Sequence, residues 1–262
     1  MLCGVRRAAT SASRLGRGAG LARQLSSTVS HRIKQEAGEF NELRERALLR
    51  HVIATATEGN PESVFEAMDT FWGTYFNGEG STEWQLRCSA LDTAISAKAP
   101  QTAMEIGTYC GYTAVRMGRY IPAGGRLISL EIDPLYAAIA TKVVEHAGLS
   151  DRVSVEIGSV QDRLHVLQSK YGISGPLDAV LLDHDVSQYL PDLQLLQNEG
   201  LVTKGTAVLC DWSLYPGSDA PAAPTDGADF MTYLNEKGGG PTTRHTLRDK
   251  EVFTVSSWQG VI

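Results

Sequence analysis

A glycine-rich turn carries the first residues of this sequence that could do chemistry. It begins with Glu105, passes through Gly107 and Gly111, and leads from an apolar run into a helical pattern at Tyr112. Glycines allow a ligand to approach the backbone closely, and Glu105 beside them suits a cationic group. The spacing Gly-x-x-x-Gly differs from the Gly-x-Gly-x-x-Gly that seats a pyrophosphate on a helix N-terminus. The turn therefore favours a cationic, phosphate-free ligand, and a plain connecting turn is the alternative.

Glu131 closes the next apolar run, 24 residues after Gly107. A carboxylate at the end of the second strand accepts hydrogen bonds from the ribose hydroxyls of adenosine cofactors. S-adenosylmethionine joins adenosine to a cationic sulfonium and an amino-acid end, and it has no phosphate. We therefore predict S-adenosylmethionine as the cofactor.

Asp183 and Asp211 follow two later apolar runs. Neighbouring parallel strands bring such carboxylates together at one edge of the sheet, and Mg²⁺ commonly uses one or two protein carboxylates with water and substrate oxygens. The pair predicts a magnesium site. The alternative is that Asp183 caps the helix that follows it.

The elements around these residues alternate between strand and helix patterns, which predicts an α/β fold with a mostly parallel sheet and helices on both faces. Ligands of such sheets bind at the carboxyl ends of the strands. The expected strands are Thr102–Ile106, Arg126–Glu131, Val153–Ile157, Ala179–Leu182 and Thr206–Cys210, and the helices between them are Tyr112–Tyr120, Leu135–Ala147, Arg163–Tyr171 and Tyr189–Asn198.

Three helices are expected before the sheet, over Glu39–Ala56, Pro61–Phe71 and Thr82–Ala97, and an edge hairpin is expected after it, over Arg244–Leu247 and Val252–Ser256. Small and polar residues dominate Pro216–Phe230, which predicts a mobile surface loop beside the end of the last parallel strand. A lid and an inert insertion both remain open for this loop.

The composition narrows the class of protein. Lys and Arg number 24 against 30 Asp and Glu, a net charge of −6, which argues against an extensive nucleic-acid surface and favours small neutral or cationic molecules. Four cysteines without a C-x-x-C pair make neither a disulfide framework nor a zinc site. No apolar run approaches the roughly 20 residues that span a bilayer.

The first 35 residues differ from the rest, because they contain seven basic side chains and no acid before Glu36. This Ser- and Ala-rich segment is typical of an organelle transit peptide, with a processing site near Arg23–Ser27. We expect residues 1–35 to be targeting sequence and 36–262 to form a single domain in the mitochondrial matrix, with the plastid as an alternative compartment and a basic tail as an alternative role. Removal of residues 1–25 deletes five arginines and changes the charge from −6 to −11.

Several stretches together resemble the catechol O-methyltransferase family, which has a Rossmann-like class I methyltransferase fold and uses S-adenosylmethionine. The most specific are Glu105–Met117, Tyr136–Ile139, Asp183-His184 and Tyr189–Asp192. The resemblance implies that Glu105, Gly107, Tyr109 and Thr113 contact the methionine part of the cofactor, that Glu131 holds the ribose, that Gln161 and His184 surround the adenine, that Asp183 and Asp211 bind Mg²⁺, and that Pro216 lines the substrate pocket.

The chain departs from this family at several positions. Asp185 and Val186 stand where the family has Trp and a catalytic Lys, Trp212 stands where it has a metal-binding Asn, and Cys88 replaces a glycine near the cofactor. Asp185 is a poor base because an ordinary Asp pKa is about 3.9 against about 10 for a phenol, so a third metal ligand suits it better. Trp212 suits either stacking on a substrate or packing.

The resemblance and the departures together predict an O-methyltransferase of a small hydroxyl substrate, catechols and phenols included, assisted by Mg²⁺, with Asp183 and Asp185 as the catalytic carboxylates. Loss of a general base slows such a reaction by about 10²- to 10⁴-fold without abolishing it, because positioning remains. A cofactor-binding homologue that has lost catalysis and acts through partners is the main alternative, and a nicotinamide-dependent oxidoreductase is the other.

Overall fold

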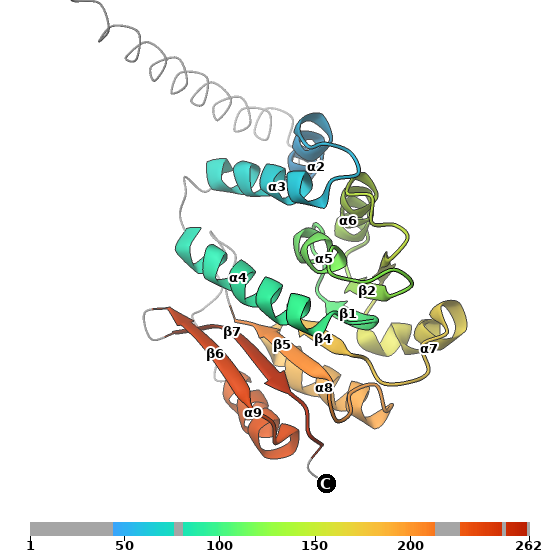
Figure 1. Cartoon of the computed structure of the whole chain (residues 1–262), viewed down its shortest axis with the longest axis vertical. Coiled ribbons are helices and arrows are strands. Elements are labelled where there is room, and N and C mark those ends of the chain that lie inside the picture. The colour runs from blue at the N-terminus through green and yellow to red at the C-terminus, as the bar shows by residue number, and fades with distance from the viewer. Residues whose placement is uncertain (1–43, 76–80, 213–225, 248–249, 261–262) are drawn as a thin grey trace, which may run out of the picture.

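The computed structural model describes residues 44–75, 81–212, 226–247 and 250–260, which fold around one seven-stranded sheet (Figure 1). The order of the strands across the sheet is β3-β2-β1-β4-β5-β7-β6, and only the pairings of β7 are antiparallel. The strands are β1 (Thr102–Ile106), β2 (Arg126–Glu131), β3 (Val153–Ile157), β4 (Ala179–Leu182), β5 (Ala207–Asp211), β6 (Thr242–Leu247) and β7 (Lys250–Ser257).

The register of the parallel strands brings the predicted chemical residues to one edge. Ile106 at the end of β1 pairs with Leu130 of β2 and with Leu182 of β4, and Leu182 pairs with Cys210 of β5. The residues that end or follow these strands are therefore neighbours, although they are far apart in the sequence.

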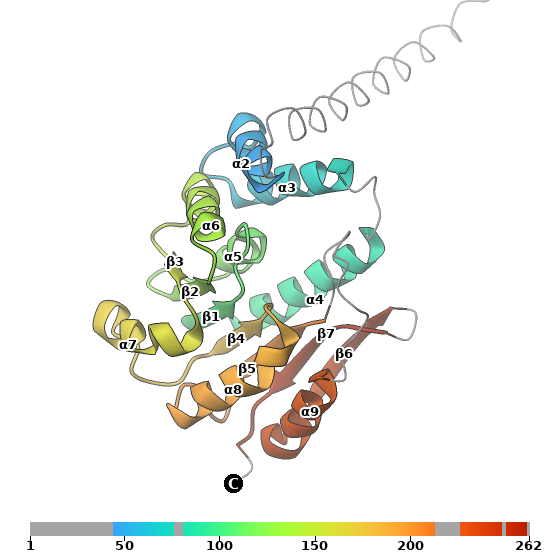
Figure 2. The ribbon, with the colours of Figure 1, turned by 180° about the vertical axis from the view of Figure 1, so that it is seen from behind.

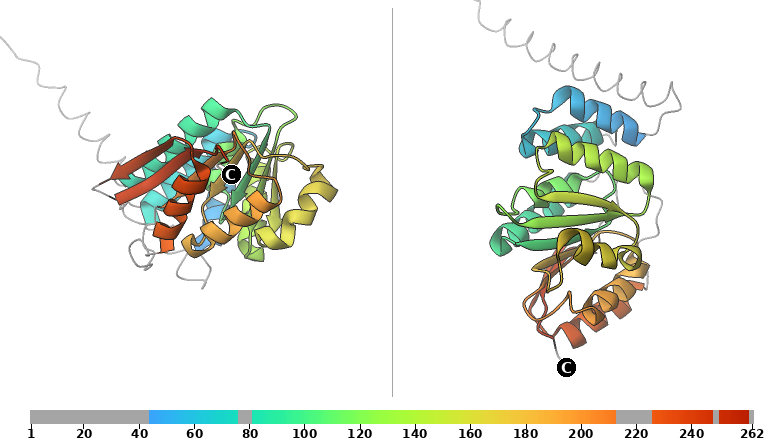
Figure 3. Two further views of the ribbon diagram at one scale, coloured as in Figure 1. Left: turned by 90° about the horizontal axis from the view of Figure 1, so that it is seen from below. Right: turned by 90° about the vertical axis from the view of Figure 1, so that its right-hand side faces the viewer.

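Helices cover both faces of the sheet, as Figures 2 and 3 show. One face packs against α4 (Ser81–Lys98), α5 (Tyr112–Gly118) and α6 (Pro134–His146), with α2 (Arg44–Thr55) and α3 (Pro61–Tyr75) outside them. The other face packs against α7 (Val160–Tyr171), α8 (Tyr189–Asn198) and α9 (Asp226–Tyr233), which continues into a π-helical turn over Leu234–Gly238. Alternate residues of each strand enter the two cores; in β1, for example, Ala103 enters one and Met104 the other.

Local signals explain where the helices of the βα units begin. The Asp133 side chain accepts hydrogen bonds from the amides of Leu135 and Tyr136, and Pro134 occupies the first turn of α6. Ser159 and Asp162 form a capping box at the start of α7, which begins three residues earlier than the predicted Arg163.

Two predictions need correction. The last parallel strand is Ala207–Asp211 rather than Thr206–Cys210, because Thr206 belongs to the preceding turn, where its hydroxyl donates to the Leu177 carbonyl. The predicted loop Pro216–Phe230 ends in a helix, since α9 begins at Asp226 and Phe230 is fully buried in the core. Residues 216–225 of that loop lie outside the described ranges.

The predicted targeting segment also lies outside the described ranges. No helix in residues 44–75, 81–212, 226–247 or 250–260 has the length and apolar character to cross a membrane. Cys88, Cys110 and Cys210 are buried free thiols.

Candidate functional site at the strand ends

The glycine turn lies directly against the end of β4. A Cβ atom added to Gly107 would lie 2.3 Å from the main-chain oxygen of Asp183, and the backbone of Gly107 has a φ of +95°. Only glycine fits this conformation and this contact. Because Gly107 has no side chain, the turn after β1 can pack against the main chain of Asp183, which directly follows β4.

Glu105 is the last-but-one residue of β1 and is fully buried. The Ser129 hydroxyl donates a hydrogen bond to its Oε2 atom, whereas Oε1 has no hydrogen-bond partner among the described residues. Burial raises the pKa of Glu105 to about 8, although hydrogen bonds from Ser129 and Thr113 oppose the shift. An unpaired buried carboxylate oxygen fits a ligand that brings a cationic donor, as the amino group of S-adenosylmethionine does.

Glu131, at the end of β2, joins the glycine turn to the loop that follows β2. Its side chain accepts hydrogen bonds from the Tyr109 amide at 2.7 Å and from the Asp133 amide at 2.9 Å, and it is 8% exposed. The structure therefore brings Glu131 to the glycine turn, where the ribose prediction needs it.

Tyr109 has a left-handed backbone (φ +47°), and its ring points away from the turn toward aromatic side chains of α3 and α6. The ring stacks on Trp72 and meets Tyr136 edge-on, and its hydroxyl donates to Glu45 of α2. The backbone of Tyr109, rather than its ring, is thus the part that faces Glu131. Glu45 is a buried acid that no motif marks in the sequence.

Gln161 and His184 stand at the starts of the segments that follow β3 and β4. Gln161 is exposed in the first turn of α7. The Nε2 atom of His184 lies 3.0 Å from Asp192, while its buried Nδ1 has no hydrogen-bond partner among the described residues. His184 therefore retains one ring nitrogen with which a ligand could pair.

Arg87 of α4 lies between the two predicted metal ligands. Its Nη2 is 2.5 Å from the Oδ2 of Asp183, and its Nε donates to the Oδ2 of Asp211. The side chains of Arg87, Asp183 and Asp211 are 2%, 7% and 0% exposed, so this is a buried three-membered ion cluster. Arg87 is not predictable from the sequence, because a single Arg in an expected helix has no distinguishing spacing.

The donor set around the two aspartates does not fit a magnesium ion. Both carboxylates are ion-paired with Arg87. The exposed Asp185 accepts a hydrogen bond from the Ser187 amide and caps the 3-10 turn Val186–Gln188. That cap belongs to Asp185, so the alternative role as a cap is wrong for Asp183. The described ranges contain no group of three His, Cys, Asp or Glu side chains that could hold a metal.

Trp212, which follows Asp211, is packed in the structure. Its ring lies against Tyr189 and Phe230, and its Nε1 donates to the Thr254 hydroxyl at 3.1 Å. Of the two roles left open for it, these contacts favour packing. Pro216, the other expected substrate residue, lies outside the described ranges.

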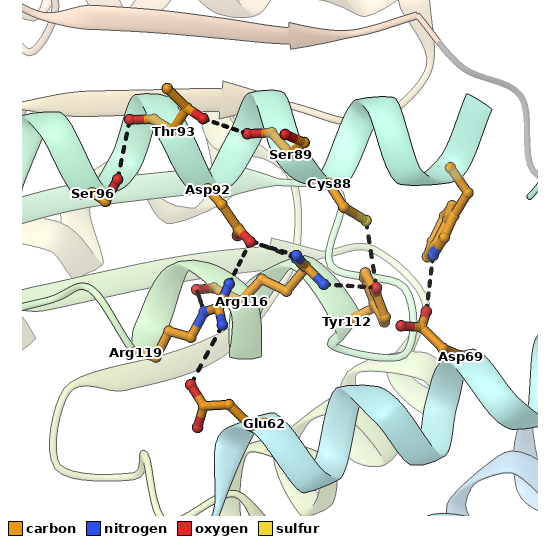
Figure 4. Close-up of polar contacts among 11 residues, drawn as sticks. Glu62, Asp69, Cys88, Ser89, Asp92, Thr93, Ser96, Tyr112, Arg116 and Arg119 are labelled. Atoms are coloured by element: carbon orange, nitrogen blue, oxygen red, sulfur yellow. Dashed lines mark hydrogen bonds and ion pairs between the residues drawn. The ribbon is translucent and has the colours of Figure 1, made fainter. Parts of the chain in front are cut away.

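A polar network fixes α4, and hence Arg87, against α3 and α5 (Figure 4). Asp92 of α4 is paired with Arg116 and Arg119, each at 2.5 Å. In the same network the Cys88 thiol lies 3.4 Å from the Tyr112 hydroxyl, so Cys88 faces α5.

The family model described as O-methyltransferase matches residues 87–236. Catechol O-methyltransferase of Mus musculus is 40% identical over 196 residues, which are 73% of this chain and 68% of that protein; the Bos taurus protein is 39% identical, with 73% and 66% covered. The chain thus spans about two thirds of the length of these curated relatives.

Solved structures give the same fold at lower identity. An O-methyltransferase from Bacillus cereus in complex with SAH has a TM-score of 0.53 and 20% identity over 66% of this chain and 80% of that chain. TomG from Streptomyces achromogenes, in complex with SAM, has a TM-score of 0.52 and 20% identity over 66% and 79%. The predicted Rossmann-like class I methyltransferase fold is confirmed.

Proposed function

Because the chain belongs to the O-methyltransferase family, we propose that it transfers the methyl group of S-adenosylmethionine to a hydroxyl oxygen of a small acceptor. Catechols and other phenols are the acceptor class that we propose, since catechol O-methyltransferases are similar over 73% of this chain. The single observation that carries the cofactor is the unpaired Oε1 of buried Glu105 beside the Gly107 turn.

The cofactor would lie along the ends of β1, β2 and β4. Glu105 would pair with its amino group, the Gly107 turn would face its methionine part together with Thr113, and Glu131 would accept from the ribose. Gln161 and His184 would flank the adenine, with the unpaired Nδ1 of His184 as one polar contact.

The reaction forms a bond between the acceptor oxygen and the methyl carbon while the bond from that carbon to sulfur breaks. S-adenosylmethionine would supply the methyl group and leave as the neutral thioether S-adenosylhomocysteine, and the hydroxyl proton would pass to Asp183. The main task of the protein is to hold oxygen, carbon and sulfur in line.

Asp183 is the side chain that we propose as proton acceptor. Burial raises the pKa of Asp183, whereas the Arg87 guanidinium opposes the shift. Asp185 is exposed and caps the 3-10 turn Val186–Gln188, so we assign the proton to Asp183 rather than to Asp185. Mg²⁺ assistance, expected from the aspartate pair, has no part in it, because the donor set does not fit the ion.

Two measurements on protein without residues 1–25 test the function. Calorimetric titration with S-adenosylhomocysteine should show saturable one-site binding, and a panel of catechols, phenols, acids and thiols should give methylated product with the oxygen nucleophiles. Binding without turnover would favour the homologue that acts through partners. Affinity for NAD without affinity for S-adenosylhomocysteine would overturn the methyltransferase and favour an oxidoreductase.

We also propose a mitochondrial location, which rests on the arginines and the missing acids of residues 1–35. Fusion of these residues to a fluorescent reporter should direct the reporter to mitochondria. Replacing Arg6, Arg7, Arg14 and Arg17 by Gln is the matched control and should leave it in the cytosol, whereas import into plastids would identify the alternative compartment.

A further inference from the structure

The ion cluster of Arg87, Asp183 and Asp211 carries an inference that deepens the proposed function and rests on it. We infer that the Arg87 guanidinium is the resident cation of this site, and that methyl transfer by this protein proceeds without a divalent metal.

The guanidinium already uses the atoms that a metal would need. Arg87 presents two N–H groups to the Oδ2 atoms of two carboxylates on neighbouring strands, through Nη2 to Asp183 at 2.5 Å and through Nε to Asp211. A planar, permanently charged fork suits such a bridge better than a point charge does. Mg²⁺ would bind through the same carboxylates, so its entry requires Arg87 to withdraw.

Withdrawal is opposed by the way in which Arg87 is held. Its guanidinium carbon lies 4.7 Å from the centre of the Trp84 ring. Trp84 is itself held in place, because its Nε1 donates to Asp69 at 2.9 Å and its ring centre lies 4.6 Å from that of Tyr112. Arg87 is therefore enclosed by an indole on one side and two carboxylates on the other. Moving a 2% exposed guanidinium out of its ion pairs would strand a buried charge.

The residues that would complete a metal shell are also committed elsewhere. Trp212 has no oxygen ligand and packs against Tyr189 and Phe230, and Asp185 caps the turn that follows β4. Arg87 by contrast cannot deprotonate or dissociate, so the positive charge it brings to the strand ends persists under all conditions in which the protein is folded.

The decisive experiment measures metal binding directly on the unmodified protein saturated with S-adenosylhomocysteine. Mn²⁺, a paramagnetic stand-in for Mg²⁺, is titrated and free Mn²⁺ is followed by electron paramagnetic resonance. We expect no saturable binding at millimolar Mn²⁺, and any acceptor that is methylated should be methylated equally with EDTA and with Mg²⁺. Saturable Mn²⁺ binding that Asp211→Asn removes, or turnover that EDTA abolishes and Mg²⁺ restores, would overturn the inference.

Variants of Arg87 supply a second, independent readout. Arg87→Met keeps the length of the side chain but removes its charge, and should let Mn²⁺ bind at least about tenfold more tightly than the unmodified protein does. Arg87→Lys keeps a positive charge and should still exclude Mn²⁺. Arg152→Gln, at an exposed pair with Asp151, is the matched control and should change nothing. Equal Mn²⁺ affinity in the unmodified protein and the Met variant would contradict the inference.

The test distinguishes this inference from the proposed function. If S-adenosylhomocysteine does not bind, the proposed function fails, whereas the Mn²⁺ titration of the unmodified protein still decides between Arg87 and a metal. If Arg87→Met does not fold, the Lys variant and the unmodified protein decide the matter.

Discussion

The main-chain oxygen of Asp183 occupies the space that a side chain at position 107 would need, 2.3 Å from the Cβ that an alanine would place there. This contact joins the glycine turn to the strand end that carries the ion cluster of Arg87, Asp183 and Asp211. A side chain at position 107 would therefore press on the main chain of Asp183.

Gly107→Ala tests that contact. The substitution combines a left-handed φ of +95° with the clash, so we expect a loss of about 2–4 kcal/mol in the free energy of unfolding and strongly reduced S-adenosylhomocysteine binding. Gly124→Ala is the control, because its φ is +81° but nothing lies within 4 Å of the added Cβ. Its loss should be about 1 kcal/mol with cofactor binding intact. Equal losses in both variants, measured by chemical denaturation, would show that the contact with Asp183 is unimportant.

Glu105 should make stability fall as pH rises. The pKa of its carboxyl is 4.5 when unfolded and about 8 when folded. Below pH 4.5 both states carry the proton, between the two values only the folded state does, and above 8 the whole cost of the buried charge is present. At about 1.4 kcal/mol per pKa unit, the wild type should lose about 4 kcal/mol relative to Glu105→Gln between pH 5 and 8. Denaturation curves of both proteins at pH 5, 6.5 and 8 measure this difference, and parallel profiles would contradict it.

The same group should release a proton when the cofactor product binds. A cationic amino group beside Glu105 favours the charged carboxylate and lowers its pKa from about 8, so binding at pH 7 expels a proton into the buffer. Calorimetric titrations in buffers of different ionisation enthalpy should give different apparent enthalpies for the wild type. Glu105→Gln should show no such release from this position, and an unchanged release would assign the proton to another group.

Glu131→Gln should weaken cofactor binding by about 10- to 100-fold, because an amide replaces one carboxylate oxygen that accepts from the turn and removes the negative charge. Binding of S-adenosylhomocysteine measures the effect. Glu145→Gln on the exposed face of α6, where Glu145 pairs with Lys142 at 2.6 Å, is the matched control and should bind normally. A Glu131 variant with unchanged affinity would remove this residue from the site.

Val186→Lys should raise the turnover of a catechol by up to about 10²-fold at pH 8, since it restores an amine where the catechol O-methyltransferase family has its base. Val186→Met, of similar bulk without the amine, is the comparison. Equal turnover of catechol by the two variants would show that an amine at position 186 does not assist proton removal.

The sequence predicts the parts of the site that local patterns mark. Glu131 and the Gly107 turn could be placed because strand ends meet at one edge of a parallel sheet, and Asp183 and Asp211 converge for the same reason. The position of Arg87 could not be predicted, because its partners Asp183 and Asp211 lie 96 and 124 residues further along the sequence. The helix that carries it also has no pattern that marks its inward face. The helix α9 was missed because its Asp, Gly and Ala residues are typical of loops and the burial of Phe230 depends on tertiary packing.

The hydrogen bond from the Tyr109 hydroxyl to Glu45 has a practical consequence for where this chain can be shortened. Helix α2 lies outside the sheet, yet its second residue anchors the ring of a residue in the cofactor turn. A shortened chain that starts after Glu45 would keep every strand but lose the hydrogen bond that anchors Tyr109 of the glycine turn. We therefore expect the shortest active chain to include Glu45, although the sheet itself begins only at Thr102.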